Sequence, residues 1–207
     1  MNLNKQLMLQ DDFVCGTQTT GSIGQLGWSC GAGIITVSGG SATNPGIYRL
    51  ATGPVAGIIA RLTLNTSALL SLLNEHELVW VARLNTNDMQ VAVRYGLGSL
   101  PAAALFSDGI YFEKLETDTN WFCVTRSKGI QARTDTGIAI TNVMTRVSYV
   151  RSATDVKFFV GDILVATHTT NLPSVMGTPF IQIFTTTSTD KHLDVDYFEM
   201  SMNGVAR

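Results

Sequence analysis

The sequence predicts an all-β protein built as a single β-sandwich domain. Apolar and polar residues alternate with a period of two along several segments, Met89–Tyr95 among them, as in half-buried strands. Clusters of Gly, Ser, Asn and Asp separate these segments at 38–46, 85–88, 107–109 and 127–129, as turns do. The 207 residues include 25 Thr and 19 Gly, which favour strands and turns respectively. This length suits one sandwich domain.

The first half of the chain contains two further alternating segments, Ile58–Leu64 and Glu77–Leu84, which we predict to be strands. Between them, NTSALLSLLNE places its leucines at i, i+1, i+3 and i+4. This spacing predicts one short helix lying over a loop.

Residues Gly109–Gly129 hold aromatic side chains among charged ones, so they raise the question of a ligand-binding strip. The segment divides at the polar tetrad Thr117–Asn120, and each half alternates. We interpret it as two adjacent antiparallel strands, each burying one aromatic row, although outward aromatic rings could still meet a sugar or a neighbouring subunit.

The second half contains strands at Met144–Arg151 and Phe180–Phe184, and a hairpin at 155–173 around a Gly161-Asp162 turn. This turn predicts a cross-strand register. The expected pairs are Val160 with Ile163, Phe158 with Val165, Val156 with Thr167, Phe159 with Leu164 and Asp155 with His168. The last strand, HLDVDYFEMSM, changes its apolar phase, which predicts a β-bulge near Tyr197.

Composition excludes two classes of partner. Charged residues are 14% of the chain, the net charge is −2 and Lys and Arg do not cluster, so no nucleic-acid footprint is expected. No apolar run approaches the roughly 20 residues that span a bilayer, so we expect no membrane insertion. Met1–Gln10 has mixed polarity and resembles neither a signal peptide nor an anchor. We expect this segment, 1–10, to be an arm that docks on another chain, and 11–207 to form the sandwich.

The cysteines and histidines form no recognisable site. Cys15, Cys30 and Cys123 lack metal-ligand spacing and are interpreted as buried thiols, although Cys15 and Cys30 could bridge if their strands pair. His76, His168 and His192 lie far apart, with no nucleophile motif beside them.

Two segments resemble a known family. VKFFVGDILVATHTTNLP is similar to the hairpin of concanavalin A-like jelly-roll domains, the lectin/glucanase and laminin G-like superfamily, and LDVDYFEM resembles their C-terminal strand. GSIGQLGW at 21–28, NPGIYRL at 44–50, GIYFEKLETDTNWFCVTRSKG and TDTG at 134–137 resemble tailed-bacteriophage virion proteins with that fold. The resemblance spans nearly the whole chain and implies a jelly roll on a virion, as a capsid subunit or on a fibre.

The superfamily also suggests two kinds of chemistry. Some of its glucanases carry Glu-x-Asp-x-x-Glu on a bulged strand, whose outer carboxylates flank the glycosidic bond at about 5–5.5 Å from each other. Here DVDYFE puts the shorter Asp194 in the first position and Glu199 in the last, at the C-terminus of the chain, and we interpret both as solvated strand-face carboxylates.

Its plant lectins bind calcium through Asp/Asn loops, and two loops here offer such oxygens. These are Asn85, Asn87 and Asp88 in one loop, and Asp118 and Asn120 in the other. We interpret them as turn-forming residues. No catalytic, cofactor-binding or metal-ligating residue is therefore assigned, and no cofactor is expected.

The sequence thus predicts a non-enzymatic virion structural protein, a capsid decoration or cement subunit that binds the major capsid protein or other virion proteins. It would be made in the host cytoplasm and lie on the virion surface, as a homo-oligomer with a trimer favoured. The alternative is a carbohydrate-binding adhesin module of a tail or head fibre that recognises a host glycan. A glycoside hydrolase is the third hypothesis.

Overall fold

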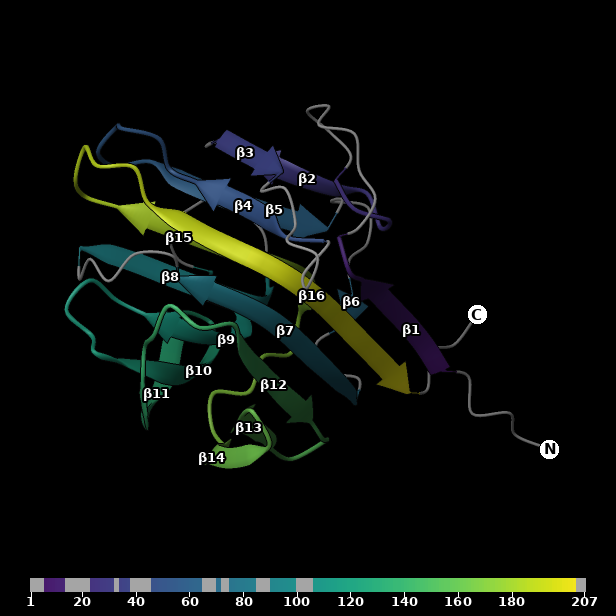
Figure 1. Cartoon of the computed structure of the whole chain (residues 1–207). Helices are drawn as coiled ribbons and strands as arrows, with labels where there is room; N and C mark the ends of the chain where they lie inside the picture. Colours follow the sequence, from purple (N-terminus) through teal and green to yellow (C-terminus); the bar gives the residue numbers. More distant parts are fainter. Residues whose placement is uncertain are drawn as a thin grey trace.

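The computed structural model describes residues 6–13, 23–31, 34–37, 46–64, 70–71, 75–84, 90–99 and 106–203. These residues form sixteen strands and no helix, arranged as two antiparallel sheets that face each other (Figure 1). The predicted all-β jelly-roll sandwich is therefore confirmed. No helix in this part of the chain could cross a membrane.

The first sheet, sheet A, has the order β14-β13-β12-β7-β16-β4-β3, with β1 also paired to β16. Its strands are β1 (Gln6–Asp11), β3 (Ile34–Val37), β4 (Tyr48–Ala51), β7 (His76–Leu84), β12 (Thr145–Arg151), β13 (Val156–Val160), β14 (Ile163–His168) and β16 (His192–Asn203).

The second sheet, sheet B, has the order β11-β10-β9-β8-β15-β5-β2, with β6 paired to β15. Its strands are β2 (Trp28–Gly31), β5 (Ile59–Leu64), β6 (Leu70–Ser71), β8 (Val91–Gly98), β9 (Gly109–Lys114), β10 (Asn120–Ser127), β11 (Ile130–Ala139) and β15 (Met176–Thr185). The two strands predicted within Gly109–Gly129 are β9 and β10, which pair antiparallel as expected.

The core lies between the sheets and is formed by one face of each strand. At one end Phe198 of β16 packs against Trp28 and Trp80, with ring centroids 4.8 and 4.7 Å away. All three side chains are completely buried. Alternation along each strand leaves every second side chain on the outer face of its sheet, and these outer faces carry the polar groups considered below.

Asp11 at the end of β1 holds the following loop. Its carboxylate accepts hydrogen bonds from the backbone N–H of Phe13 and Leu26, both at 2.9 Å, and from Trp28 Nε1 at 3.0 Å. Gly24 passes so close that a Cβ there would lie 2.3 Å from the Asp11 carboxylate, and its φ of 67° also favours glycine.

β16 has the predicted bulge. Its pairing with β7 shifts between Val195 and Tyr197, so Asp196 is the extra residue. The shift lets Leu193 and Val195 face the core before it, and Phe198 and Met200 after it.

The β13–β14 hairpin differs from its predicted register. The pairs Val160–Ile163 and Phe159–Leu164 are confirmed, but a second bulge follows them. Beyond it Phe158 pairs with Ala166 and Val156 with His168, so the predicted pairs of Phe158 with Val165 and Val156 with Thr167 are wrong by one residue.

The predicted pair of Asp155 with His168 is wrong for the same reason. Asp155 accepts a hydrogen bond from Ser152 Oγ at 2.6 Å. The His168 ring instead lies between Thr125 Oγ1 and Thr134 Oγ1, each 2.9 Å from a ring nitrogen, and joins sheet A to sheet B.

Two predictions fall partly outside the described residues. Within the expected helix at 65–75, Leu70 and Ser71 form β6, so the helix is wrong for these two residues; 65–69 and 72–74 lie outside the described part. Within the expected arm 1–10, Gln6 onward forms β1 on the chain's own sheet A. Docking of this segment on another chain stays a prediction.

Candidate functional site

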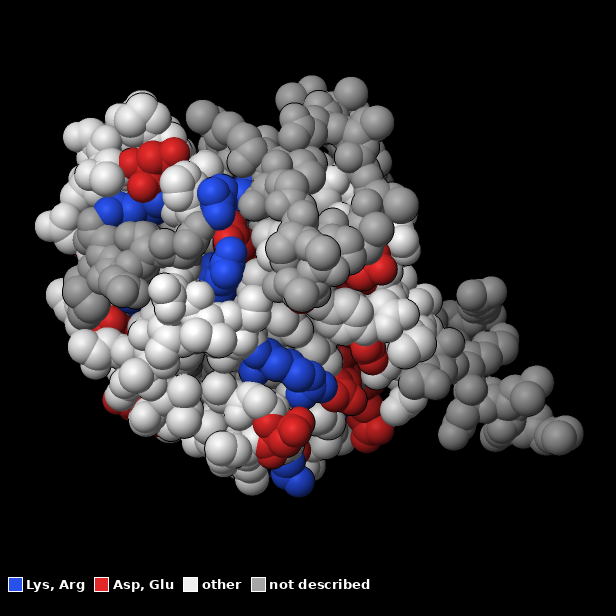
Figure 2. Space-filling model, in the orientation of Figure 1, with Lys and Arg blue, Asp and Glu red and all other residues white. Residues whose placement is uncertain are grey.

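The DVDYFE motif of β16 places carboxylates on the outer face of sheet A. Figure 2 shows this side, where acidic and basic side chains meet over β16 and its neighbours on a mostly uncharged surface. Asp194, Tyr197 and Glu199 lie opposite Arg83, Val81 and Val79 of β7. The motif is therefore on the surface of one sheet, but its members have different surroundings.

Asp194 is neutralised by two arginines. Its carboxylate accepts hydrogen bonds from Arg49 Nε and Nη2 at 2.8 and 3.1 Å, and from Arg83 Nε at 3.0 Å with Nη2 at 2.9 Å. Its side chain is completely buried, so the interpretation of Asp194 as a solvated carboxylate is wrong. Burial alone would raise the pKa of Asp194, but the bonds from Arg49 and Arg83 outweigh it and lower the pKa. Asp194 is therefore neither a proton donor nor a free nucleophile.

Glu199 is held by its neighbours on the same face. Tyr197 Oη donates a hydrogen bond to Glu199 Oε2 at 2.5 Å, and Gln10 Nε2 of β1 donates to Tyr197 Oη. Burial and the bond to Glu199 raise the pKa of the Tyr197 hydroxyl, so it stays protonated and keeps donating. Glu199 is half-buried and remains partly accessible.

Asp196 lies in a gap along one edge of β16. β4 pairs with this edge up to Val195 and β1 pairs with it from Phe198 onward, so the bulged residue falls between the two strands. Partial burial, and then the charge of Asp12 just beyond β1, raise the pKa of the Asp196 carboxyl. A partly buried carboxyl whose pKa is raised by burial and by a specific charged neighbour is a candidate for a functional site.

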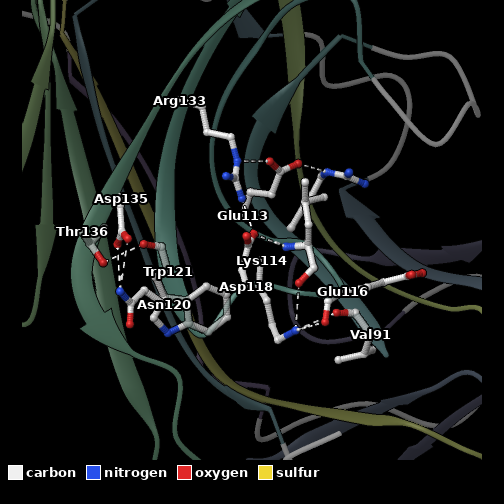
Figure 3. Close-up of polar contacts among 12 residues, drawn as sticks. Val91, Glu113, Lys114, Glu116, Asp118, Asn120, Trp121, Arg133, Asp135 and Thr136 are labelled. Atoms are coloured by element: carbon white, nitrogen blue, oxygen red, sulfur yellow. Dashed lines mark hydrogen bonds and ion pairs between the residues drawn. The ribbon is translucent and has the colours of Figure 1, made fainter. Parts of the chain in front are cut away.

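The outer face of sheet B holds a second ionic cluster, drawn in Figure 3. Glu113 of β9 accepts a hydrogen bond from Arg94 Nε at 2.6 Å and another from Arg133 Nε at 2.9 Å. Arg133 also pairs with Asp118. Its guanidinium carbon lies 3.4 Å from the centre of the Phe122 ring. Glu113 is almost completely buried, so this cluster braces β8, β9, β10 and β11, and the carboxylate that Arg94 and Arg133 share is not accessible.

The other sequence candidates take structural positions where they are described. Asp118 Oδ2 accepts from the backbone N–H of Leu115 at 2.7 Å and so holds the turn, as predicted. Asn120 is instead the first residue of β10, and its side chain donates to Asp135 of β11 at 3.1 Å. No group of three or more His, Cys, Asp or Glu among the described residues could hold a metal ion. Asn85, Asn87 and Asp88 lie outside the described residues.

The cysteines are thiols where they can be placed. Cys123 is buried and Cys30 half-buried, both are free, and burial raises the pKa of each. Cys15 lies outside the described residues. His76 Nε2 lies 3.1 Å from Tyr149 Oη, and His192 Nε2 lies 3.0 Å from Asp190. The structure brings none of the three histidines together.

No protein-family model and no curated protein matches the sequence. Solved structures do match along nearly its whole length. A protein of unknown function from Shewanella oneidensis MR-1 is 12% identical, with a TM-score of 0.70 over 98% of this chain and 90% of its own. The Emp47p carbohydrate recognition domain is 11% identical, with 0.67 over 96% and 95%. A β-glucanase of Bacillus licheniformis is 15% identical, with 0.61 over 93% and 97%.

Further similar structures include a transglycosylase, a β-1,3-1,4-glucanase and an endo-1,3-β-glucanase. These findings overturn the prediction of a non-enzymatic virion subunit, because the named proteins that share the whole fold are carbohydrate-processing enzymes and carbohydrate recognition domains. A low content of charged residues and a high content of Thr are compatible with an enzyme or a recognition domain of this fold and equally with a capsid subunit. Composition therefore could not distinguish these functions. What the comparisons show is the fold: this chain has the concanavalin A-like jelly-roll fold.

Proposed function

We propose that the protein hydrolyses a β-linked glucan on the outer face of sheet A, with Asp196 and Glu199 as its two working carboxyl groups. The fold supports this proposal because similar structures are a glucanase, a laminarinase and a transglycosylase. The observation that carries it is the position of the half-buried Asp196 at the bulge, three residues from the half-buried Glu199, and the raised pKa of Asp196 agrees with it.

Glycoside hydrolysis needs one carboxyl group that is protonated and a second that is ionised. Asp196 fits the first role, since burial and Asp12 favour its neutral form. In the reaction its proton goes to the leaving oxygen as the glycosidic C–O bond breaks. One water is consumed; its oxygen forms the new bond at the anomeric carbon, and its proton restores the acid.

Glu199 fits the role of the ionised partner. The hydrogen bond from Tyr197 fixes the orientation of its carboxylate, and Gln10 in turn fixes the Tyr197 hydroxyl. Such support from neighbouring side chains keeps a catalytic group in its working geometry. The partly exposed Tyr197 ring and the exposed Gln10 amide offer a sugar an apolar surface and a hydrogen-bonding group.

The test is release of reducing sugar from β-1,3-1,4-glucan and β-1,3-glucan by the full chain. Asp196→Asn and Glu199→Gln should each lower the rate by about 100-fold or more, the size of effect that general acid–base groups have. Asp162→Asn is the matched control, because Asp162 is a fully exposed carboxylate in the Gly161-Asp162 turn. Its rate should equal that of the wild type.

The pH dependence gives a second, independent readout. Because Asp196 must be protonated, the rate should fall as the pH rises above its pKa. Asp12→Asn removes a charge that raises this pKa, so the falling limb should move to lower pH. Glucan binding without any release of sugar, or full activity in both carboxyl variants, would overturn the proposal.

A further inference from the structure

A glutamine on the outer face of sheet B lies between two arginines. Gln182 of β15 is directly opposite Arg61 of β5 on one side and Arg94 of β8 on the other. All three side chains are buried although they point away from the main core: Gln182 is 1% exposed, Arg94 7% and Arg61 8%. The three form one row across neighbouring strands.

The amide of Gln182 is only half satisfied. Its Oε1 accepts a hydrogen bond from Arg61 Nε at 2.9 Å, whereas its buried Nε2 has no hydrogen-bond partner. Buried N–H groups are nearly always paired, because a donor that is buried without an acceptor loses its hydrogen bonds to water and gains none in the protein. The missing partner must be an acceptor.

The two charged side chains that flank this donor in the row are both arginines, and one of them, Arg94, is also ion-paired with Glu113. Burial lowers the pKa of Arg61, and the nearby charge of Arg94 lowers it further. Arg94 Nε points to Glu113 on the far side of the row, and the Arg61 guanidinium lies 5.5 Å from the centre of the Phe106 ring. Both arginines also have further interactions, and the donor of the row that lacks a partner is Gln182 Nε2.

From this arrangement we infer that the Arg61–Gln182–Arg94 row binds a small oxyanion, a carboxylate or a sulfate group. Its oxygens would accept from Gln182 Nε2 and its charge would lie near both guanidinium groups, whose N–H donors suit pairs of oxyanion oxygens. The group can come from a free anion or from the substituent of an acidic sugar. The inference concerns sheet B and is independent of the hydrolysis proposed for sheet A.

Thermal unfolding of the full chain tests the site, with sodium sulfate or sodium glucuronate against sodium chloride at equal ionic strength. A ligand at 100 times its Kd should raise Tm by about 5–10 °C. A rise with glucuronate alone identifies the sugar acid as the source, and a rise with sulfate identifies the free anion; both support the site. No rise beyond that in chloride would overturn it.

Gln182→Glu makes the test specific to this row. The new carboxylate supplies the missing acceptor charge, so Tm should rise without added anion and the anion response should disappear. Gln131→Glu is the matched control, since Gln131 is an exposed glutamine of β11 that accepts from Arg126. The Tm of the Gln131→Glu protein should respond to the anion like that of the wild type. If the anion raises the Tm of the Gln182→Glu protein as much as that of the wild type, the inference is refuted.

Discussion

Asp194→Asn is the sharpest test of how the outer face of sheet A is built. The substitution keeps the shape of the side chain but removes the charge that two arginines share. Breaking a buried ion pair from one side costs about 3–5 kcal/mol. Arg49 and Arg83 are 28% and 32% exposed and can regain some water, so we expect the lower end, about 3 kcal/mol.

Urea unfolding followed by tryptophan fluorescence measures this loss. With a urea dependence of about 2 kcal/mol/M, the midpoint should fall by about 1.5 M at pH 7. The folded pKa of Asp194 lies below its ordinary value of 3.8, so its stabilisation is full above that value and is lost as the pH falls through the folded pKa. The difference between the two proteins should therefore shrink in strong acid.

Asp162→Asn again serves as the control and should change the midpoint by no more than the error of the measurement. A loss below about 1 kcal/mol for Asp194→Asn at pH 7 would show that the carboxylate is solvated after all. The ion pairs of Asp194 with Arg49 and Arg83 would then not explain why Asp194 is excluded from the proposed chemistry.

Three further outcomes are expected. Glu113→Gln leaves Arg94 and Arg133 without their shared carboxylate and should destabilise the fold by about 3 kcal/mol in urea unfolding, whereas a change within error would contradict the bracing role. Asp11→Ala removes three hydrogen bonds and should cost about 3 kcal/mol by the same measurement, with Asp11→Asn losing less. Burial lowers the pKa of His168 below 6.5, so stability should decline as the pH falls below 6.5; an equal decline in His168→Gln would exclude this residue as the cause.

The strands and the bulge of β16 could be predicted because their signals are local. Alternation along a strand follows directly from which face is buried, and the apolar phase change around Tyr197 is visible within one segment. The bulge in β14 could not be predicted in this way. A tight turn fixes the register only until an extra residue is inserted, and nothing near Val165 in the sequence marks that insertion.

The surroundings of the candidate carboxylates could not be predicted from the sequence, for a different reason. Arg49 and Arg83 lie 145 and 111 residues from Asp194 along the chain, and only the sheet brings them together. The row of Arg61, Gln182 and Arg94 likewise joins three strands that no sequence spacing connects. A spacing motif alone therefore gave Asp194 a solvated role that the fold does not support.

The position of β16 also constrains how the molecule is made. Although this strand comes last in the described order, it runs through the interior of sheet A, with β7 along one edge and β4 and β1 along the other (Figure 1). During translation β1 cannot pair with β16 until His192–Asn203 have left the ribosome. Sheet A can close only after release of these residues, and contacts of such long sequence separation favour slow folding.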